Sequence, residues 1–118
     1  MPAINFQPRF ADLVESGKKL QTIRKTNRFK IGDTVTLYTG QRTKQCRALG
    51  EGVIYGVQPI KLLPNLRIDI SGCTLTLREA DALAQADGFM CKADMLEWFK
   101  KMHGLPFDGW LIRWRLNR

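Results

Sequence analysis

Hydrophobic residues along the chain recur with two different periods, and the period separates the expected helices from the expected strands. Near the N-terminus, Phe10, Leu13 and Val14 fall at positions i, i+3 and i+4, which places them on one face of a helix. Pro8 suits the first turn of a helix, and Gly17 suits the left-handed residue that often ends one. We therefore expect a first helix over about Pro8 to Ser16.

Two more helices are expected in the second half of the chain. Thr76 and Glu79 form a capping-box pattern, which marks the start of a helix that ends near Gly88. Another helix is expected over about residues 92–103, where four apolar residues recur at helical spacing: Met95, Trp98, Phe99 and Met102. This spacing predicts that all four are core residues.

Alternation with period two, typical of strands with one buried face, covers most of the remaining chain. The expected strands are residues 4–6, 20–25, 34–39, 46–60, 66–70 and 109–116. The fourth contains Gly50, Gly52 and Gly56, which commonly mark bulges or barrel corners, so a bent long strand or two short strands would fit. The order of elements predicts an α+β protein, a mixed or antiparallel β-barrel with helices packed on its outside.

The composition, 44% hydrophobic and 25% charged, is that of an ordinary folded protein, and the length suits a single domain over residues 1–118. No long apolar run or leader-like N-terminus is present, so we expect a cytoplasmic protein with no membrane partner. We also expect the protein to be a monomer. Cys46, Cys73 and Cys91 are widely spaced and are expected to be reduced packing residues. With His103 as the single histidine, neither a metal nor a cofactor is expected.

Positive charge is concentrated in the first part of the chain. The net charge is +8; residues 1–47 hold ten Lys or Arg against three Asp or Glu, a balance of +7, whereas residues 48–118 hold nine against eight, a balance of +1. A positive potential attracts phosphate, which predicts RNA or a nucleoside-like ligand as the partner, although basic residues also serve solubility. The residues expected to contact nucleic acid are Arg28, Lys30, Arg42, Lys44 and Arg47.

The segment from Gly17 to Lys25 gathers the polar groups that a ligand site needs. In an extended strand, Thr22 and Arg24 lie on one face while Ile23 anchors the other face in the core. A hydroxyl, a guanidinium and ammonium groups in a small area can hold a phosphate or a polarised carbonyl. The side chains expected to bind the ligand are Lys18, Arg24, Lys25 and Tyr38, the last by stacking on a base.

In this segment the sequence resembles the ASCH domain family, a PUA-like β-barrel group with an early Phe, a helix and then the pattern G-x-K-x-x-T-x-R. The matching residues are Phe10, Gly17, Lys19, Thr22 and Arg24. Residues 29–33 resemble the family's F-x-x-G-D entry to its next strand, and residues 86–89 its acidic-Gly-Phe segment between two helices. The resemblance implies a domain that binds RNA or a modified nucleoside in a basic cleft.

The chain is also similar to the small bacterial ASCH amidohydrolases that remove the acetyl group from N4-acetylcytidine. That resemblance implies a catalytic triad of Lys19, Thr22 and Asp87, with Asp87 standing where a Glu is usual. Lys19 would act as a base on Thr22 or on a water, Asp87 would orient Lys19 or shuttle a proton, and Arg24 would hold the ligand or the developing oxyanion.

Other interpretations stay open at this point. The protein could be a non-catalytic RNA-binding module or a ribonuclease, although one histidine excludes a paired-histidine mechanism. A surface for protein partners would draw on the C-terminal tryptophans, which strand alternation assigns to the core. Thr22 is also an ordinary strand former, and Asp87 beside Gly88 is typical of a helix-ending turn.

Overall fold

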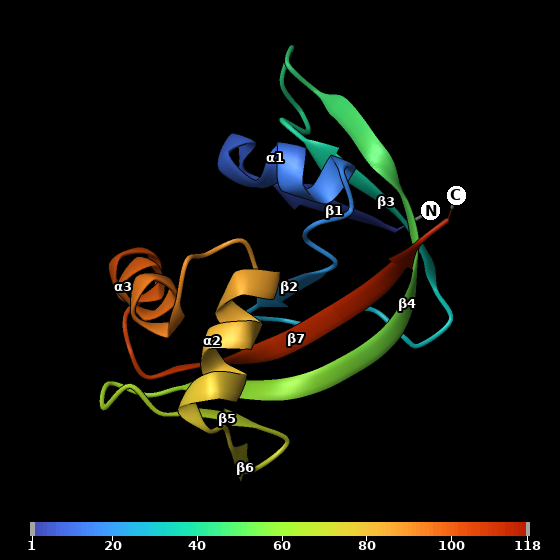
Figure 1. Ribbon diagram of the computed structural model, residues 1–118. Helices are drawn as coiled ribbons and strands as arrows, with labels where there is room; N and C mark the ends of the chain where they lie inside the picture. Colours follow the sequence, from blue (N-terminus) through green and yellow to red (C-terminus); the bar gives the residue numbers. More distant parts are fainter. Residues whose placement is uncertain (1, 118) are drawn as a thin grey trace.

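The computed structural model describes residues 2–117. Within that range the chain forms a curved β-sheet with three helices (Figure 1). The strands are β1 (Ala3–Phe6), β2 (Gln21–Arg24), β3 (Thr34–Thr39), β4 (Arg47–Leu62), β5 (Ile68–Ile70), β6 (Cys73–Thr74) and β7 (Phe107–Leu116), and the helices are α1 (Pro8–Glu15), α2 (Leu77–Ala86) and α3 (Lys92–Met102).

All seven strands belong to one mixed sheet. Strand β1 pairs with β3 in parallel, whereas β3 with β4, β4 with β7 and β7 with β2 are antiparallel. The main path is therefore β1-β3-β4-β7-β2, and β5 and β6 extend the far end of β4. The expectation of an α+β protein with a mixed sheet is confirmed.

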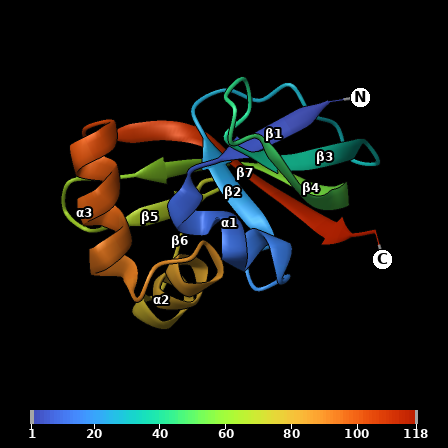
Figure 2. The same ribbon diagram turned by 90° about the horizontal axis from the view of Figure 1, so that it is seen from above.

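Strand β4 is a single bent strand of 16 residues, one of the two forms expected from its glycines. Its first half pairs with β3 and residues 60–62 pair with β5, while β7 runs along the opposite edge. The register with β7 shifts between Ile54 and Gly56, as expected of a bulge. This bend curves the sheet around the helices, which lie on its concave side (Figures 1 and 2). The expectation that the helices pack on the outside of a barrel is therefore wrong.

The sheet does not close into a barrel through the strands that the structure describes. Its path begins at β1 and ends at β2, and side chains connect these two edges. Arg24 Nη2 donates to the Asn5 carbonyl at 2.7 Å, and Arg28 Nη2 donates to the Ala3 carbonyl at 3.1 Å. Two guanidinium groups thus bridge the gap in which a closed barrel would have a backbone ladder.

The core lies between the helices and the concave face of the sheet. Val14 of α1, Met95 of α3 and Trp114 of β7 are fully buried, as the periodicity predicted. Met102 is 52% exposed, so its prediction as a core residue is wrong. It occupies the last turn of α3, where its side chain lines the edge of a cavity instead of packing in the core.

The cysteines were expected to be packing residues, but none of the three is buried in the core. Cys46 and Cys73 are exposed and Cys91 is half-buried. Cys46 precedes β4 and Cys73 lies on the short strand β6, both at the margin of the sheet. No helix between residues 2 and 117 is long and apolar enough to cross a membrane.

Candidate active site

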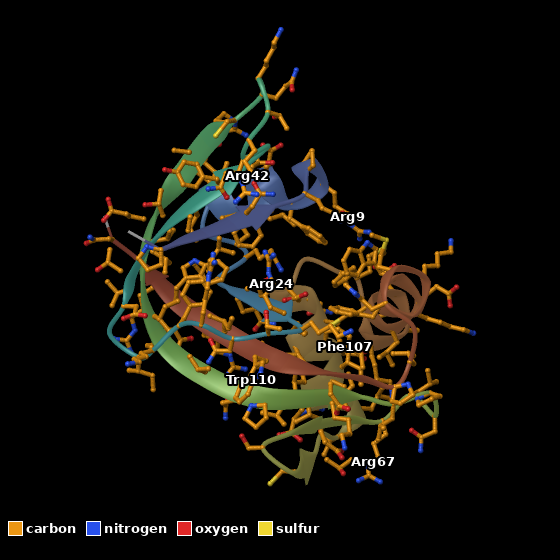
Figure 3. The ribbon with its side chains drawn as sticks, turned by 180° about the vertical axis from the view of Figure 1, so that it is seen from behind. Arg9, Arg24, Arg42, Arg67, Phe107 and Trp110 are labelled. Atoms are coloured by element: carbon orange, nitrogen blue, oxygen red, sulfur yellow. The ribbon has the colours of Figure 1, made fainter. Side chains whose placement is uncertain are left out.

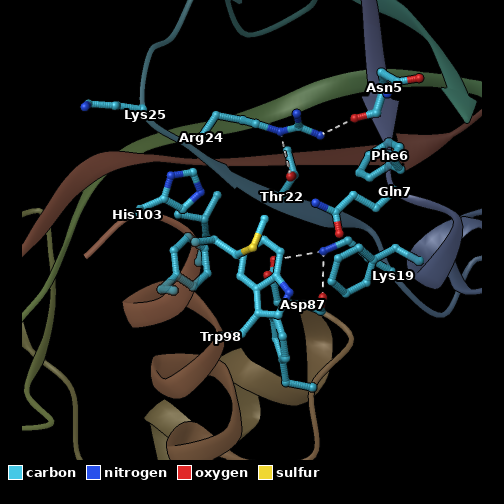
Figure 4. A pocket seen from close by; sticks show the side chains of 15 residues that line it. Asn5, Phe6, Gln7, Lys19, Thr22, Arg24, Lys25, Asp87, Trp98 and His103 are labelled. Atoms are coloured by element: carbon cyan, nitrogen blue, oxygen red, sulfur yellow. Dashed lines mark hydrogen bonds and ion pairs between the residues drawn. The ribbon is translucent and has the colours of Figure 1, made fainter. Parts of the chain in front are cut away.

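A cavity of about 230 Å³ opens between β1, β2 and α3 (Figure 4). The cavity lies inside the curve of the sheet, and the labelled Arg24 points into this curve (Figure 3). Polar side chains from four separate parts of the sequence line it together with an aromatic wall. The polar members are Asn5, Gln7, Lys19, Thr22, Arg24, Lys25, Asp87 and His103.

The end of α1 determines which of two adjacent lysines enters the cavity. Gly17 has φ +83°, the left-handed conformation that glycine adopts without strain. The backbone N–H groups of Lys18 and Lys19 both donate to the Leu13 carbonyl at 2.9 Å, which ends the helix in a tight turn. As a result Lys18 is exposed, whereas Lys19 is only 2% exposed and points inward.

Lys19 and Asp87 form a buried ion pair. The distance from Lys19 Nζ to Asp87 Oδ1 is 3.1 Å, and Nζ also donates to the Asp87 backbone carbonyl at 2.6 Å. The Phe10 ring lies beneath the ammonium group, 4.9 Å from Nζ to the ring centroid. The shorter aspartate side chain therefore reaches Lys19 directly, because the C-cap of α2 brings its backbone to the cavity.

Gln21 completes the environment of Asp87, and sequence reasoning missed it. Its Nε2 donates to Asp87 Oδ1 at 3.2 Å and to the Leu83 carbonyl at 3.3 Å. The signal that could have found it is strand alternation, which places Gln21 on the same face as the core anchor Ile23. A buried amide needs polar partners, so a glutamine on that face indicates a polar site.

Burial favours the neutral form of both Lys19 and Asp87. Desolvation lowers the pKa of Lys19, and the neighbouring Asp87 carboxylate opposes that change. Desolvation likewise raises the pKa of Asp87, against the effect of Lys19. One proton is therefore held between two groups whose basicities have been brought closer together, which favours proton transfer at this point.

Thr22 and Arg24 lie on one face of β2, as the alternation predicted. Arg24 Nε donates to Thr22 Oγ1 at 3.0 Å, and the Arg24 guanidinium lies 5.2 Å from the Phe6 ring centroid. Thr22 is buried at 5% exposure. A cation that donates to the hydroxyl oxygen favours the alkoxide form, and burial strengthens that effect.

An aromatic wall faces these polar groups. Trp98 is half-buried, and its ring packs at 5.6 Å from that of Phe89 and at 6.0 Å from that of Phe10. His103 continues the wall at 5.6 Å from Phe99. The helical spacing of α3 assigned Trp98 wholly to the core, because periodicity cannot distinguish a core from a cavity lined by the same face. Such a wall suits a flat, partly apolar ring.

The structure brings together five of the residues predicted for catalysis or ligand binding and leaves two outside. The cavity is lined by Lys19, Thr22, Arg24, Lys25 and Asp87. Lys18 points to solvent, and Tyr38 is half-buried on β3, away from the cavity lining. Periodicity and charge alone could not separate Lys18 from Lys19, and only the family resemblance selected Lys19. The geometry of the turn after α1 shows that Lys19 is the lysine that enters the cavity.

The residues predicted to contact nucleic acid are all exposed: Arg28, Lys30, Arg42, Lys44 and Arg47. Arg47 already has acidic neighbours, with Nη1 at 2.7 Å from Glu15 Oε1 and Nη2 at 3.9 Å from Asp12 Oδ1. Its charge is therefore partly compensated, and the other four are better placed to meet phosphate. Between residues 2 and 117, no cluster of three or more His, Cys, Asp or Glu is arranged to hold a metal ion.

Comparison with known proteins adds no relative from which a role could be transferred. No protein-family model, no curated protein and no solved structure matches the chain. Function must therefore be inferred from the geometry of this site.

Proposed function

We propose that the protein is an ASCH-type amidohydrolase that removes the acyl group from the exocyclic nitrogen of a cytosine nucleoside such as N4-acetylcytidine. The observation that carries the proposal is the convergence of Lys19, Thr22 and Asp87 on one buried cavity. Asp87 lies 68 residues from Lys19 in the chain, and a base, a hydroxyl and a carboxylate together are the parts that amide hydrolysis needs.

The proposed relation to the PUA-like barrel rests on how the two edges of the sheet are joined. Arg24 and Arg28 bridge β2 and the segment after it to β1 through hydrogen bonds to backbone carbonyls. An open sheet whose two edges are joined in this way is related to a barrel in which one backbone ladder is replaced by a seam of side chains. The seam also brings Arg24 to Thr22, so the same feature supports both fold and site.

The cavity suits a pyrimidine nucleoside in size and chemistry. Its volume of about 230 Å³ accommodates a single base and part of a ribose. Trp98 supplies an aromatic surface for the ring, and the exposed Lys25 at the rim suits the polar sugar side.

In the first chemical step, neutral Lys19 takes the proton of the Thr22 hydroxyl while Oγ1 attacks the amide carbonyl carbon. The carbonyl oxygen becomes an oxyanion, which Arg24 stabilises through its guanidinium. The C–N bond then breaks as Lys19 returns the proton to the leaving nitrogen. The products of this step are cytidine and an acyl ester on Thr22.

In the second step, Lys19 takes a proton from water and the resulting hydroxide attacks the ester. The C–O bond to Thr22 breaks as Lys19 returns its proton to Oγ1, and the acyl group leaves as acetic acid, which ionises in solvent. Asp87 keeps Lys19 in place and accepts its proton at the start of the cycle, since burial brings their basicities together.

The test is turnover of N4-acetylcytidine by the purified protein, with cytidine and acetate quantified by mass spectrometry. We expect Lys19→Ala and Thr22→Val each to lower the rate by at least about a hundredfold, because each removes a reacting group. Lys18→Ala is the matched control, since this neighbour points to solvent, and it should retain the wild-type rate. Wild-type turnover in Thr22→Val would contradict the proposal.

A non-catalytic RNA-binding module is the second candidate. It is favoured by the exposed basic residues and by the two acceptors that already engage Lys19. In that case the wild-type protein would bind cytosine-containing RNA without converting the acetylated nucleoside, and Lys19→Ala would act through stability alone.

A further inference from the structure

A second hollow adjoins the cavity on the far side of Arg24. Its volume is about 270 Å³, and it shares Asn5 and Arg24 with the cavity. It lies over the seam between β1 and the segment that follows β2. The residues that line it are Ala3, Ile4, Asn5, Arg24, Thr26, Arg28, Phe29 and Gln41.

Two arginines are held in place in this hollow by the same kind of contacts. Arg24 donates to the Asn5 carbonyl and lies 5.2 Å from the Phe6 ring centroid. Arg28 donates to the Ala3 carbonyl and lies 5.5 Å from the Phe29 ring centroid. Each of these contacts uses part of the donor capacity of a guanidinium, so fixed N–H donors remain for a ligand.

The charge of the hollow is of one sign. Among the described residues that line it there are two arginines and no acidic side chain, and Thr26 and Gln41 add neutral donors. A third hollow, near Trp110, differs in this respect, since its lysines face Asp69 and Asp108, and Lys61 lies 3.7 Å from Asp108. Of the two neighbours of the cavity, the hollow between the arginines is the one suited to an anion.

We infer that this hollow, with Arg24 and Arg28, is a phosphate subsite, and that the ligand of the cavity is a phosphorylated nucleoside rather than a free one. The inference rests on the proposed function for the identity of the base. The hollow meets the cavity at Arg24, so a phosphate bound in the hollow lies next to the ligand of the cavity. The phosphate belongs either to a mononucleotide or to an RNA strand, and the chemistry is the same for both.

The arginines also brace the seam of the sheet, and the variants must separate the two roles. Arg28→Gln removes the charge and keeps an amide that can donate a hydrogen bond. Lys100→Gln is the matched control, because it removes one exposed charge on α3 outside both hollows. Thermal unfolding of both variants verifies that they remain folded.

The experiment measures the affinity of the wild type and both variants for cytidine, cytidine 3′-monophosphate and cytidine 5′-monophosphate by calorimetry. We expect one monophosphate to bind the wild type about tenfold more tightly than cytidine, since charge-assisted bonds to a fixed guanidinium are strong. Arg28→Gln should lose this preference and Lys100→Gln should keep it. Equal affinity for cytidine and both monophosphates, or an unchanged preference in Arg28→Gln, would overturn the inference.

Two further measurements are needed. The first distinguishes a mononucleotide from an RNA strand as the source of the phosphate, and the second tests the phosphate subsite independently of the proposed deacetylation. A cytidine dinucleotide that keeps the tenfold gain assigns the subsite to an RNA strand, and one that loses it assigns the subsite to a mononucleotide. Titration with inorganic phosphate, followed through the NMR signals of the arginine Nε–H groups, needs neither base nor turnover. Shifts confined to Arg24 and Arg28 support the subsite even if deacetylation is absent, and no shifts at these residues count against it even if deacetylation is observed.

Discussion

At the scale of single residues, the site depends on an ion pair that is costly to break. Lys19 and Asp87 are 3% and 5% exposed in their side chains, so each charge is compensated mainly by the other. Removing one partner of a buried pair leaves an uncompensated charge, which costs more than the pair itself contributes.

We therefore expect Lys19→Met to lower the free energy of unfolding by about 3–5 kcal/mol at neutral pH. The loss should be smaller near pH 4. Burial raises the pKa of Asp87 above its ordinary value of 3.8, and the variant removes the lysine that opposes this rise, leaving Arg24 as the neighbouring charge. A carboxyl whose folded pKa is raised contributes stability that is present below its unfolded pKa and lost as pH rises through the folded value.

Urea unfolding of the wild type and the variant between pH 4 and pH 7 measures this difference. In the wild type, the pair holds one proton near neutrality in both the folded and unfolded states, so it adds no slope there. Lys61→Met is the control, because the Lys61–Asp108 pair is 52% and 72% exposed and should contribute less than about 1 kcal/mol. A pH-independent loss in Lys19→Met would contradict the assignment of a buried carboxyl.

Single residues also mark how far sequence reasoning reached at the site. Thr22 and Arg24 were placed on one face correctly, because strand alternation is a local property. The partnership of Lys19 with Asp87 came from a resemblance, since no local pattern joins residues 68 positions apart. Gln21 went unrecognised for the same reason, as its partners lie on α2 and were not visible from its own strand.

At the scale of elements, the turn between α2 and α3 fixes Asp87 against α1. Gly88 follows Asp87 with φ +98°, and a Cβ there would lie 3.0 Å from Phe10 Cδ1 and 3.2 Å from Leu13 Cδ1. Both contacts are with side chains of α1 that are held in the packed structure. A side chain at this position would push the turn away from the cavity.

Gly88→Ala should lower the free energy of unfolding by about 1–2 kcal/mol through backbone strain and by about 1–3 kcal/mol more through overpacking. Turnover should also fall, because Asp87 moves with the turn. Gly32→Ala is a matched control, since Gly32 has φ +97° and a Cβ there would meet nothing within 4 Å, so this variant isolates the strain. Thermal and urea unfolding measure the loss of stability in each variant. Equal losses would show that a Cβ at position 88 does not clash with α1.

Elements with strong local signals were predicted well. The capping box at Thr76 and the alternation over residues 34–39 match α2 and β3. The end of α3 was less predictable, because Met102 continues the apolar spacing of the helix after the core has ended. Apolar periodicity indicates which face of a helix is apolar. Only the tertiary structure determines how far along the helix another element covers that face.

At the scale of the whole molecule, the α+β class followed from the order of elements, but the seam of the sheet did not. The pairing of β2 with β7 joins residues near the two ends of the chain, and β1 pairs with β3 in parallel. Such pairings are set by the burial of the whole sheet. The two arginines at the seam resemble ordinary surface charge in the sequence, where their backbone partners on β1 could not be foreseen.

The distribution of charge gives a prediction for the molecule as a whole. Of the basic residues in the first part of the chain, Lys19 is buried and Arg47 is paired with Glu15, so the exposed loop residues Arg42 and Lys44 carry more of the outward potential than a count implies. If RNA follows this face, its affinity must fall with salt, because bound phosphates release counterions.

We expect the logarithm of the affinity for a single-stranded cytosine-rich RNA to fall linearly with the logarithm of the salt concentration. The double variant Arg42→Gln/Lys44→Gln should reduce the slope by about 1.4, since each contact with a single strand contributes about 0.7. Arg78→Gln/Lys101→Gln removes the same charge from exposed positions on α2 and α3 and should leave the slope near the wild-type value. Fluorescence anisotropy at several salt concentrations measures these slopes. Equal reductions in the two double variants would mean that net charge alone attracts RNA, whereas a selective reduction assigns the contact to the β3–β4 loop.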